Sequence, residues 1–171
     1  MRFCRLLNPL LKDTLAPLFT ADPPKSAAEV LAAAQAKKKD GDMADGNALC
    51  GAWAALISGL KDKSADELKK ELLRRAKTYA KVLRAFATSG KVELALLRYM
   101  QRLCLQAEKH LEPHFALMLH VLYDVDVLSE DAILHWYHKG SDPTGRDVFL
   151  PQTEALVKWL EEESEEEEES D

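Results

Sequence analysis

Glycine, cysteine and strand-forming patterns are scarce in this 171-residue chain, and each shortage excludes a class of protein. The seven glycines include no phosphate-loop pattern, so nucleotide binding has no support. The three cysteines, Cys4, Cys50 and Cys104, are odd in number and far apart, which argues against a disulfide framework or a zinc site and favours a reducing compartment. No apolar run approaches the roughly 18 residues of a membrane span. We therefore expect a cytoplasmic protein that is not embedded in a membrane.

Charge is unevenly distributed along the chain. The 29 acidic and 23 basic residues give a net charge of −6, but nine of the acids lie in residues 160–171, which contain no Lys or Arg. The remaining 20 acids face 23 bases, so residues 1–159 carry a net charge of +3. A mildly basic body with a strongly acidic end is typical of a protein that meets a charged partner.

The pattern of apolar residues predicts an all-α protein. Sustained alternation of apolar and polar residues is absent, while Leu and Ala, both strong helix formers, dominate. Ser64 followed by Glu67 forms a capping-box pattern that opens a helix. Helices are expected over residues 48–60, 65–87, 92–105, 114–127, 130–139 and 149–162.

Three regions are expected along the chain. Residues 1–45 form an N-terminal appendage, in which Pro23 and Pro24 break any helix and Ser26 can cap a short Ala-rich one. Residues 46–162 form the helical domain, and residues 163–171 form a disordered acidic tail. The helix pairs begin near residues 48, 91 and 130, close to the ~40-residue unit of stacked HEAT-type hairpins. A generic helical bundle is the alternative.

The histidines do not form a convincing catalytic or metal site. His110 and His114 have the i, i+4 spacing of a metal clamp, but Pro113 between them places a helix boundary there. The chain contains neither an HExxH nor a GxSxG motif. We therefore expect a protein that is not an enzyme and has no catalytic, metal or cofactor site.

Basic residues form a stripe at helical spacing. On one helix their side chains would share a face, which we call the basic stripe: Lys70, Arg74, Lys77, Lys81 and Arg84. This stripe is either a solvated face partly balanced by Glu67 and Glu71 or a docking face for an acidic partner or RNA. No aromatic residue other than Tyr79 lies near it, so direct RNA binding is not favoured.

Two acidic clusters lie near two tryptophans. The first acidic cluster surrounds a predicted turn and comprises Asp124, Asp126, Glu130 and Asp131. The second acidic cluster comprises Glu161, Glu162, Glu163, Glu165, Glu166, Glu167, Glu168 and Glu169. Because acids repel one another at a helix C-terminus, the last helix is expected to fray after Leu160. The acidic block is then a solubilising tail or a lure for a basic partner, and Trp53, Trp136 and Trp159 are expected in the core.

Residues 122–137, LYDVDVLSEDAILHWY, and 155–169, ALVKWLEEESEEEEE, resemble the aromatic-and-acidic boxes of a known family. That family is the two-tryptophan HEAT domain of translation initiation proteins, found in initiation factor 5, in the epsilon subunit of factor 2B and in the mimic proteins of initiation factor 5. The resemblance spans residues 48 to 171 and is greatest to the mimic proteins, through residues 83–97, 126–140 and 145–171. Residues 1–45 match no part of the family.

The resemblance implies a function in translation initiation. In this family the acidic boxes bind lysine-rich blocks of the beta subunit of initiation factor 2, and other faces contact initiation factor 3 components of the preinitiation complex. The two acidic clusters would then be the partner-binding charges and the basic stripe a second face. A chain of this kind would compete with initiation factor 5 without catalysis. The alternatives are a C-terminal fragment of initiation factor 5 or of the factor 2B epsilon exchange subunit, and an RNA-binding scaffold.

Overall fold

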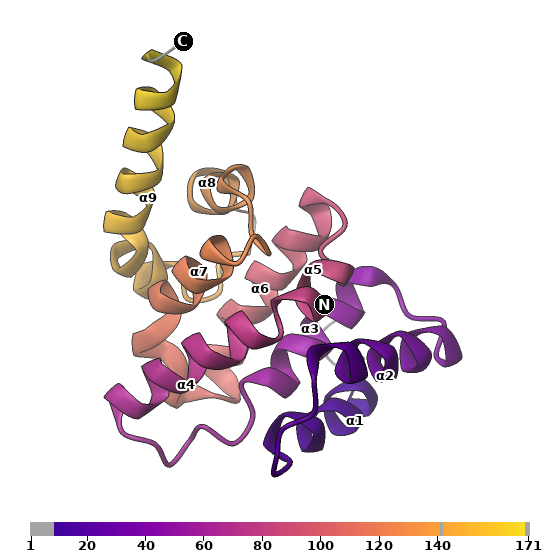
Figure 1. Cartoon of the computed structure of the whole chain (residues 1–171). Coiled ribbons are helices and arrows are strands. Elements are labelled where there is room, and N and C mark those ends of the chain that lie inside the picture. The colour runs from indigo at the N-terminus through magenta and orange to yellow at the C-terminus, as the bar shows by residue number, and fades with distance from the viewer. Residues whose placement is uncertain (1–8, 141, 170–171) are drawn as a thin grey trace.

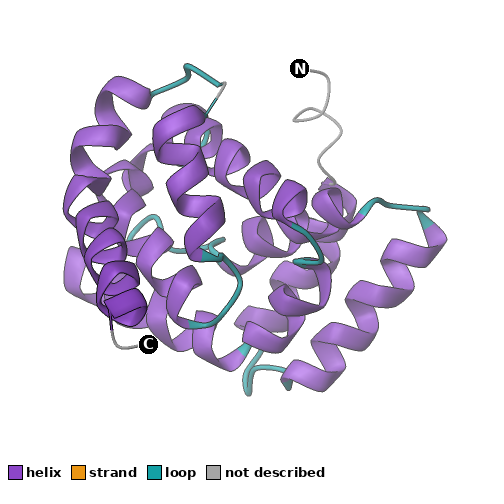
Figure 2. Ribbon diagram, turned by 90° about the horizontal axis from the view of Figure 1, so that it is seen from above, coloured by secondary structure: helices purple, strands orange, loops and turns teal. Residues whose placement is uncertain are grey.

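A computed structural model describes residues 9–140 and 142–169, and all the regular structure in these ranges is helical, which confirms the all-α prediction (Figure 2). The helices are α1 (Pro9–Thr20), α2 (Ala27–Asp40), α3 (Asp45–Leu56), α4 (Ala65–Thr78), α5 (Ala80–Phe86), α6 (Gly90–Gln106), the 3-10 helix η2 (Lys109–His114), α7 (Phe115–Asp124), α8 (Glu130–Lys139) and α9 (Arg146–Glu169). None of the helices in this part of the chain is long and apolar enough to cross a membrane.

The helices stack as two layers of consecutive hairpins. One layer runs through α1, α3, α6 and α8, each of which packs against the next. In the other layer α2 packs on α5, the short helix that continues α4, and α4 packs on α7, which in turn packs on α9 (Figure 1). Each hairpin buries its apolar face only against its neighbours, which is the arrangement of a HEAT-like solenoid.

The first hairpin corrects the expected appendage. Helices α1 and α2 are not peripheral, because Leu11, Leu15 and Phe19 are buried in the same core as the rest of the molecule. The Phe19 ring meets the buried Tyr79 ring edge-on at 4.5 Å between centroids, and the Tyr79 hydroxyl donates to the Lys25 carbonyl at 2.7 Å. The two short helices gain stability from packing on α3 and α5, which local sequence does not reveal. Residues 1–8 of the expected appendage lie outside the described residues.

Serine caps begin several helices where the sequence predicts them. Ser64 Oγ accepts a hydrogen bond from the Glu67 amide at 3.3 Å. The Glu67 carboxylate in turn accepts one from the Ser64 amide, which completes the capping box of α4. Ser26 caps α2 in the same way. The sequence allows a break in the helix expected over residues 65–87, and the structure has one, because the buried Tyr79 has non-helical backbone angles between α4 and α5.

The expected end of the last helix near residue 162 is wrong. Helix α9 continues to Glu169 and projects beyond the body of the molecule, so a disordered acidic tail is not what the structure shows for residues 163–169 (Figure 1). Glutamate is a strong helix former, and each like-charge pair costs only about a few tenths of a kcal/mol, so propensity outweighs repulsion. A contact of 2.7 Å between Glu161 Oε1 and His138 Nε2 fastens the first turn beyond Leu160 to α8.

Candidate partner-binding surface

Helices α7, α8 and α9 bring the two acidic clusters to one surface around Tyr123. Partial burial and then the surrounding carboxylates raise the pKa of the Tyr123 hydroxyl, and these carboxylates come from both clusters: Glu163, Glu130, Glu167 and Asp124. Residues 163 and 167 lie on α9, residue 130 begins α8 and residue 124 ends α7. Segments that are almost forty residues apart in the chain therefore form one negative field.

The first acidic cluster is open to solvent. Asp124, Asp126 and Asp131 are exposed, and Glu130 is half-buried. Asp126 occupies the left-handed region with φ of 63° in the tight turn between α7 and α8. Asp124 lies 3.4 Å from His120 one turn earlier, and both side chains are about half exposed. These carboxylates are accessible to a cationic partner.

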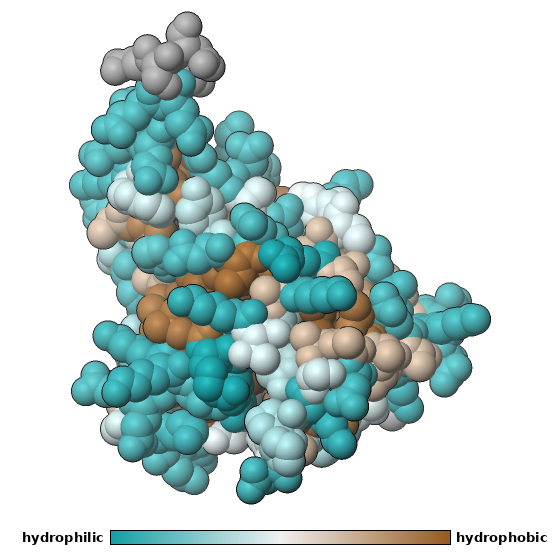
Figure 3. All heavy atoms as spheres, in the orientation of Figure 1, coloured by the Kyte–Doolittle hydropathy of each residue, from teal (hydrophilic) through white to brown (hydrophobic). Residues whose placement is uncertain are grey.

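The second acidic cluster lies on the projecting part of α9. Glu162, Glu165, Glu166 and Glu167 are exposed, and Glu161 and Glu163 are half-buried. The side chains of Glu168 and Glu169 and the whole of Asp171 lie outside the described residues. Figure 3 shows this projecting part of α9 covered by hydrophilic residues, while apolar atoms reach the surface over α7 nearby. The charged, projecting part of α9 therefore lies next to an apolar area over α7.

Trp159 corrects the expectation of a core tryptophan. The buried positions of α9 include Thr153, Val157 and Leu160, and Trp159 is one residue, or about 100°, from Leu160 on the helix. Its ring therefore lies at the edge of the buried face and is 38% exposed. It packs beside His120 and edge-on against Tyr123, at 5.5 and 5.9 Å between ring centroids. We call the two acidic clusters together with these three rings the acidic-aromatic surface.

The other two tryptophans lie in the core. Trp53 of α3 and Trp136 of α8 are each 1% exposed. The Trp136 indole N–H donates to Gln101 Oε1 at 2.9 Å, and its ring lies against Phe115 at 5.5 Å between centroids. The Gln101 amide in turn donates to the Thr144 carbonyl at 2.8 Å. Trp136 thus holds α8 against α6 and the loop before α9.

The basic stripe lies on two helices rather than one. All five of its side chains are exposed, three on α4 and two on α5, with the break at Tyr79 between them. Arg74 is the one member of the stripe in an ion pair within the described residues, through two contacts to Glu71 of 3.1 and 2.6 Å. The stripe is therefore a solvent-facing positive patch on α4 and α5.

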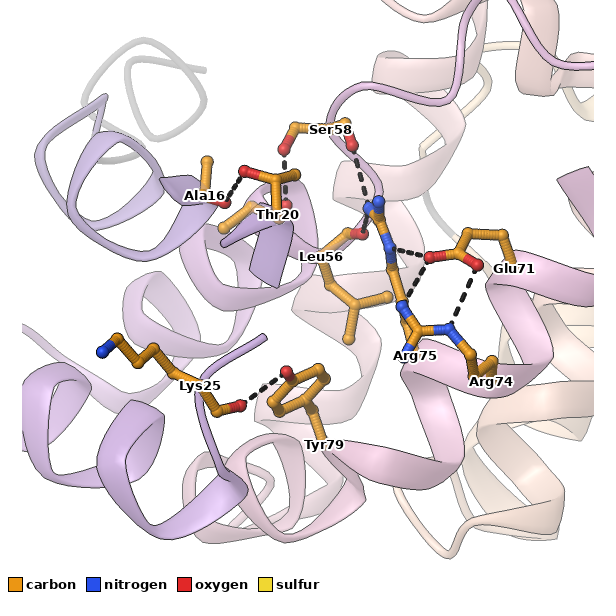
Figure 4. Close-up of polar contacts among 10 residues, drawn as sticks. Ala16, Thr20, Lys25, Leu56, Ser58, Glu71, Arg74, Arg75 and Tyr79 are labelled. Atoms are coloured by element: carbon orange, nitrogen blue, oxygen red, sulfur yellow. Dashed lines mark hydrogen bonds and ion pairs between the residues drawn. The ribbon is translucent and has the colours of Figure 1, made fainter. Parts of the chain in front are cut away.

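Arg75 is a structural residue that the sequence pattern does not reveal. It neighbours the stripe but is only 5% exposed, and its guanidinium donates to the carbonyls of Leu56 and Ser58 at 2.7 and 2.9 Å (Figure 4). These carbonyls lie at the C-terminal end of α3, where helix carbonyls lack partners within the helix. Arg75 also donates to Glu71 at 2.9 Å. In the sequence, Arg75 differs from the arginines of the basic stripe only in lying one residue after Arg74, which turns it to another face of the helix.

The ion pairs of Glu71 predict a pH-dependent contribution to stability. Hydrogen bonds from Arg74 and then Arg75 outweigh the effect of burial and lower the Glu71 pKa from 4.5 to about 2. A lowered carboxyl pKa stabilises the fold above pH 4.5, and this stabilisation is lost as pH falls toward 2. Glu71→Gln should therefore lower the free energy of unfolding at pH 7 and lower it less at pH 3, as measured by urea unfolding. An equal difference at both pH values would contradict the assignment.

The histidine pair lies at a turn, as Pro113 suggests. His110 and His114 belong to η2, in which the i, i+4 geometry of an α-helix does not apply. Burial, followed by the positive field of Lys69, lowers the His114 pKa. In the described part of the chain no three His, Cys, Asp or Glu residues gather in a group that could hold a metal ion.

The described residues form a two-layer, HEAT-like helical solenoid with the acidic-aromatic surface at one end. A comparison with known protein families also finds a HEAT-like domain. Residues 92–170 match the family model W2, described as eIF4-gamma/eIF5/eIF2-epsilon. In this region the chain belongs to the W2 family, a HEAT-like domain of translation initiation factors.

The chain is related to the eIF5-mimic proteins. It is 40% identical over 123 residues to eIF5-mimic protein 2-B of Danio rerio and 37% identical over 119 residues to eIF5-mimic protein 1 of Mus musculus. These alignments cover 70% and 67% of this chain but only 29% and 28% of the relatives, so the match spans less than a third of the length of either. The resemblance read from the two aromatic-and-acidic boxes is thereby confirmed.

Proposed function

We propose that this W2 domain is a non-catalytic regulator of translation initiation that binds lysine-rich segments of initiation factor 2 beta through its acidic-aromatic surface. The observation that carries the proposal is the convergence of both acidic clusters around Tyr123, whose hydroxyl pKa is raised by partial burial and then by carboxylates of both clusters. Opposed charge blocks associate quickly and with strong salt dependence, which suits a regulator that exchanges partners. Such a domain works in the cytoplasm and competes with initiation factor 5 for the same lysine-rich segments.

Trp159 supplies the apolar part of this proposed contact. A ring that is 38% exposed beside carboxylates offers its face to a lysine ammonium or to the aliphatic stem below it. A cation over an exposed tryptophan contributes about 0.5–1 kcal/mol. Trp159→Ala should therefore weaken binding of a lysine-rich peptide only about threefold, because each 1.4 kcal/mol is a factor of ten.

The second proposed face is the basic stripe. Its exposed cations, apart from Arg74, make no ion pair within the described residues, so they remain available for an acidic segment. We assign this face to components of initiation factor 3. The domain would then bind one initiation factor at the acidic-aromatic surface and another at the basic stripe. Lys77→Gln with Lys81→Gln would weaken that contact and leave binding of the lysine-rich peptide unchanged.

Calorimetric titration with a lysine-rich peptide of initiation factor 2 beta tests the main proposal. We expect the intact chain to bind at low salt and more weakly at physiological salt, and a chain ending at Leu160 to lose about tenfold or more in affinity, since an electrostatic contact loses its attraction with its charges. The core position of Leu160 is kept in this truncation.

A pair of charge-matched variants separates the surface from net charge. Asp124→Asn with Glu163→Gln removes one carboxylate from each acidic cluster, and Asp13→Asn with Asp40→Asn removes two exposed carboxylates from α1 and α2. Weaker binding only in the first variant supports the assigned surface. Equal weakening in both, or no binding by the intact chain at low salt, would overturn it.

A further inference from the structure

A shallow pocket of about 170 Å³ lies between α6, α8 and the loop before α9, away from the acidic-aromatic surface. Helix α6 contributes Leu94, Arg98 and Gln101 to its lining, α8 contributes His135, Trp136 and Lys139, and the loop contributes Gly140 and Asp142. The spacing of these residues along α6 and α8 places one side of each helix toward the pocket. The floor is rigid, because Gln101 and Trp136 are buried and hydrogen-bonded to each other.

The pocket is positively charged without internal compensation. Arg98, His135 and Lys139 are exposed, and neither Arg98 nor Lys139 forms an ion pair with any carboxylate in the part of the chain that the structure describes. The Arg98 guanidinium makes only a long contact of 3.4 Å to the Leu94 carbonyl one turn earlier. Both cations are therefore available to a ligand.

The acidic groups beside the pocket are already engaged. Asp142 is the one acid of the lining, and its two oxygens accept from Arg102 Nε and the Thr144 amide, each at 3.0 Å. The free carbonyls at the C-terminus of α8 would also repel an anion. Arg146 covers two of them, with donations of 2.9 and 2.7 Å to the carbonyls of Trp136 and Tyr137. Gly140 makes room for this guanidinium, since a Cβ there would collide with it.

We propose that this pocket binds the phosphoryl group of a phosphorylated serine or threonine on a partner protein, with Arg98 and Lys139 as its charged ligands and His135 as a further donor. A phosphomonoester carries about −1.5 to −2 charges and three acceptor oxygens, which match an arginine fork and an ammonium. The volume is below the ~300 Å³ at which pockets for whole small molecules begin, so the site holds one group of a larger ligand. The buried Trp136 ring offers no stacking surface for a base, which favours a phosphopeptide over RNA.

The Trp136 indole N–H at the pocket floor provides a local readout by NMR. The full chain is titrated with a peptide containing one phosphoserine, with the same peptide unphosphorylated, with inorganic phosphate and with a short RNA, all at matched chloride concentration. We expect a saturable shift of the Trp136 indole resonance with the phosphopeptide, a weaker one with inorganic phosphate and none with the unphosphorylated peptide.

Two matched variants locate the site. Arg98→Gln with Lys139→Gln should weaken phosphopeptide binding about tenfold or more, because it removes two charge-assisted contacts. Lys61→Gln with Lys63→Gln removes the same charge from two exposed lysines between α3 and α4, outside both proposed binding faces, and should leave binding unchanged. Near-native circular dichroism of both variants shows that the fold is retained.

Several results would overturn the proposal: no saturation with the phosphopeptide, an equal response from the unphosphorylated peptide, or unaltered binding by Arg98→Gln with Lys139→Gln. Inorganic phosphate or RNA binding as tightly as the phosphopeptide would overturn the assignment to a phosphorylated protein. The pocket shares no residue with the acidic-aromatic surface, so this outcome is independent of the test with the lysine-rich peptide.

Discussion

Replacing Trp136 by alanine is expected to lower the free energy of unfolding by about 3–5 kcal/mol, the range for truncating a buried large aromatic residue. The ring is 1% exposed, packs against Phe115 and lies 5.8 Å below the Arg146 guanidinium carbon. Its removal leaves a cavity between α6 and α8 and an unpaired Gln101 oxygen that had accepted the indole N–H. Urea unfolding followed by circular dichroism measures the loss.

Trp159→Ala is the matched control, because it deletes the same side chain from the same domain. Its ring is 38% exposed, so the expected loss of stability is below about 1 kcal/mol. The two tryptophans would then have different roles: Trp136 stabilises the fold, and Trp159 contributes to binding at the acidic-aromatic surface. Similar destabilisation by both substitutions would show that Trp159 is also a core residue and would remove its assigned part in binding.

Arg75→Ala is the second substitution with a large expected effect, a loss of about 2–4 kcal/mol. The substitution leaves the carbonyls of Leu56 and Ser58 without their buried donor and removes one of the two guanidinium partners of Glu71 (Figure 4). For a chain of this size, each kcal/mol lowers the melting temperature by about 2–4 °C. Thermal unfolding therefore provides a direct measurement.

Arg74→Ala is the control for Arg75→Ala. Arg74 bonds the same carboxylate, but 45% of its side chain is exposed, and exposed ion pairs contribute only about 0–1 kcal/mol. A small effect at Arg74 and a large one at Arg75 would show that the carbonyls of α3, rather than the charge of Glu71, are the important partners. Equal effects would contradict this account.

Where both charge assignments hold, the domain presents a negative and a positive surface at separate places on one rigid solenoid. The acidic-aromatic surface lies on α7, α8 and α9, and the basic stripe on α4 and α5. Because α4 packs on α7, which packs on α9, the two surfaces are joined through packed helices. This geometry suits a domain that holds two partners of opposite charge at once.

Local sequence information predicts those features that depend on nearby residues. The capping box at Ser64 needs only a Glu three residues later, and the all-helical class follows from composition and apolar spacing. The acidic and basic clusters are likewise visible as patterns of residue types. The pairing of helices at a step near forty residues indicates the solenoid because a hairpin cannot bury its own apolar face.

Other features depend on contacts between distant segments. The stability of α1 and α2, the buried side of Arg75 and the exposed edge on which Trp159 lies are all decided by which helix packs against which. Helix α9 continues past Leu160 because the helix propensity of glutamate outweighs the repulsion between like charges. The pocket between α6 and α8 also arises only when Arg98 and Lys139, forty-one positions apart, face the same space.

The sequence by itself therefore determined the helical class, the family and the two acidic boxes, because these rest on composition, periodicity and residues close together in the chain. The tertiary structure decided that the boxes form one surface around Tyr123, that Trp136 is internal and Trp159 external, and that the first hairpin belongs to the core. The physical reason is that burial is a property of packed neighbours. The spacing of residues along a helix shows which of them share a face. Only the packing of α7, α8 and α9 decides which of these faces is exposed to solvent.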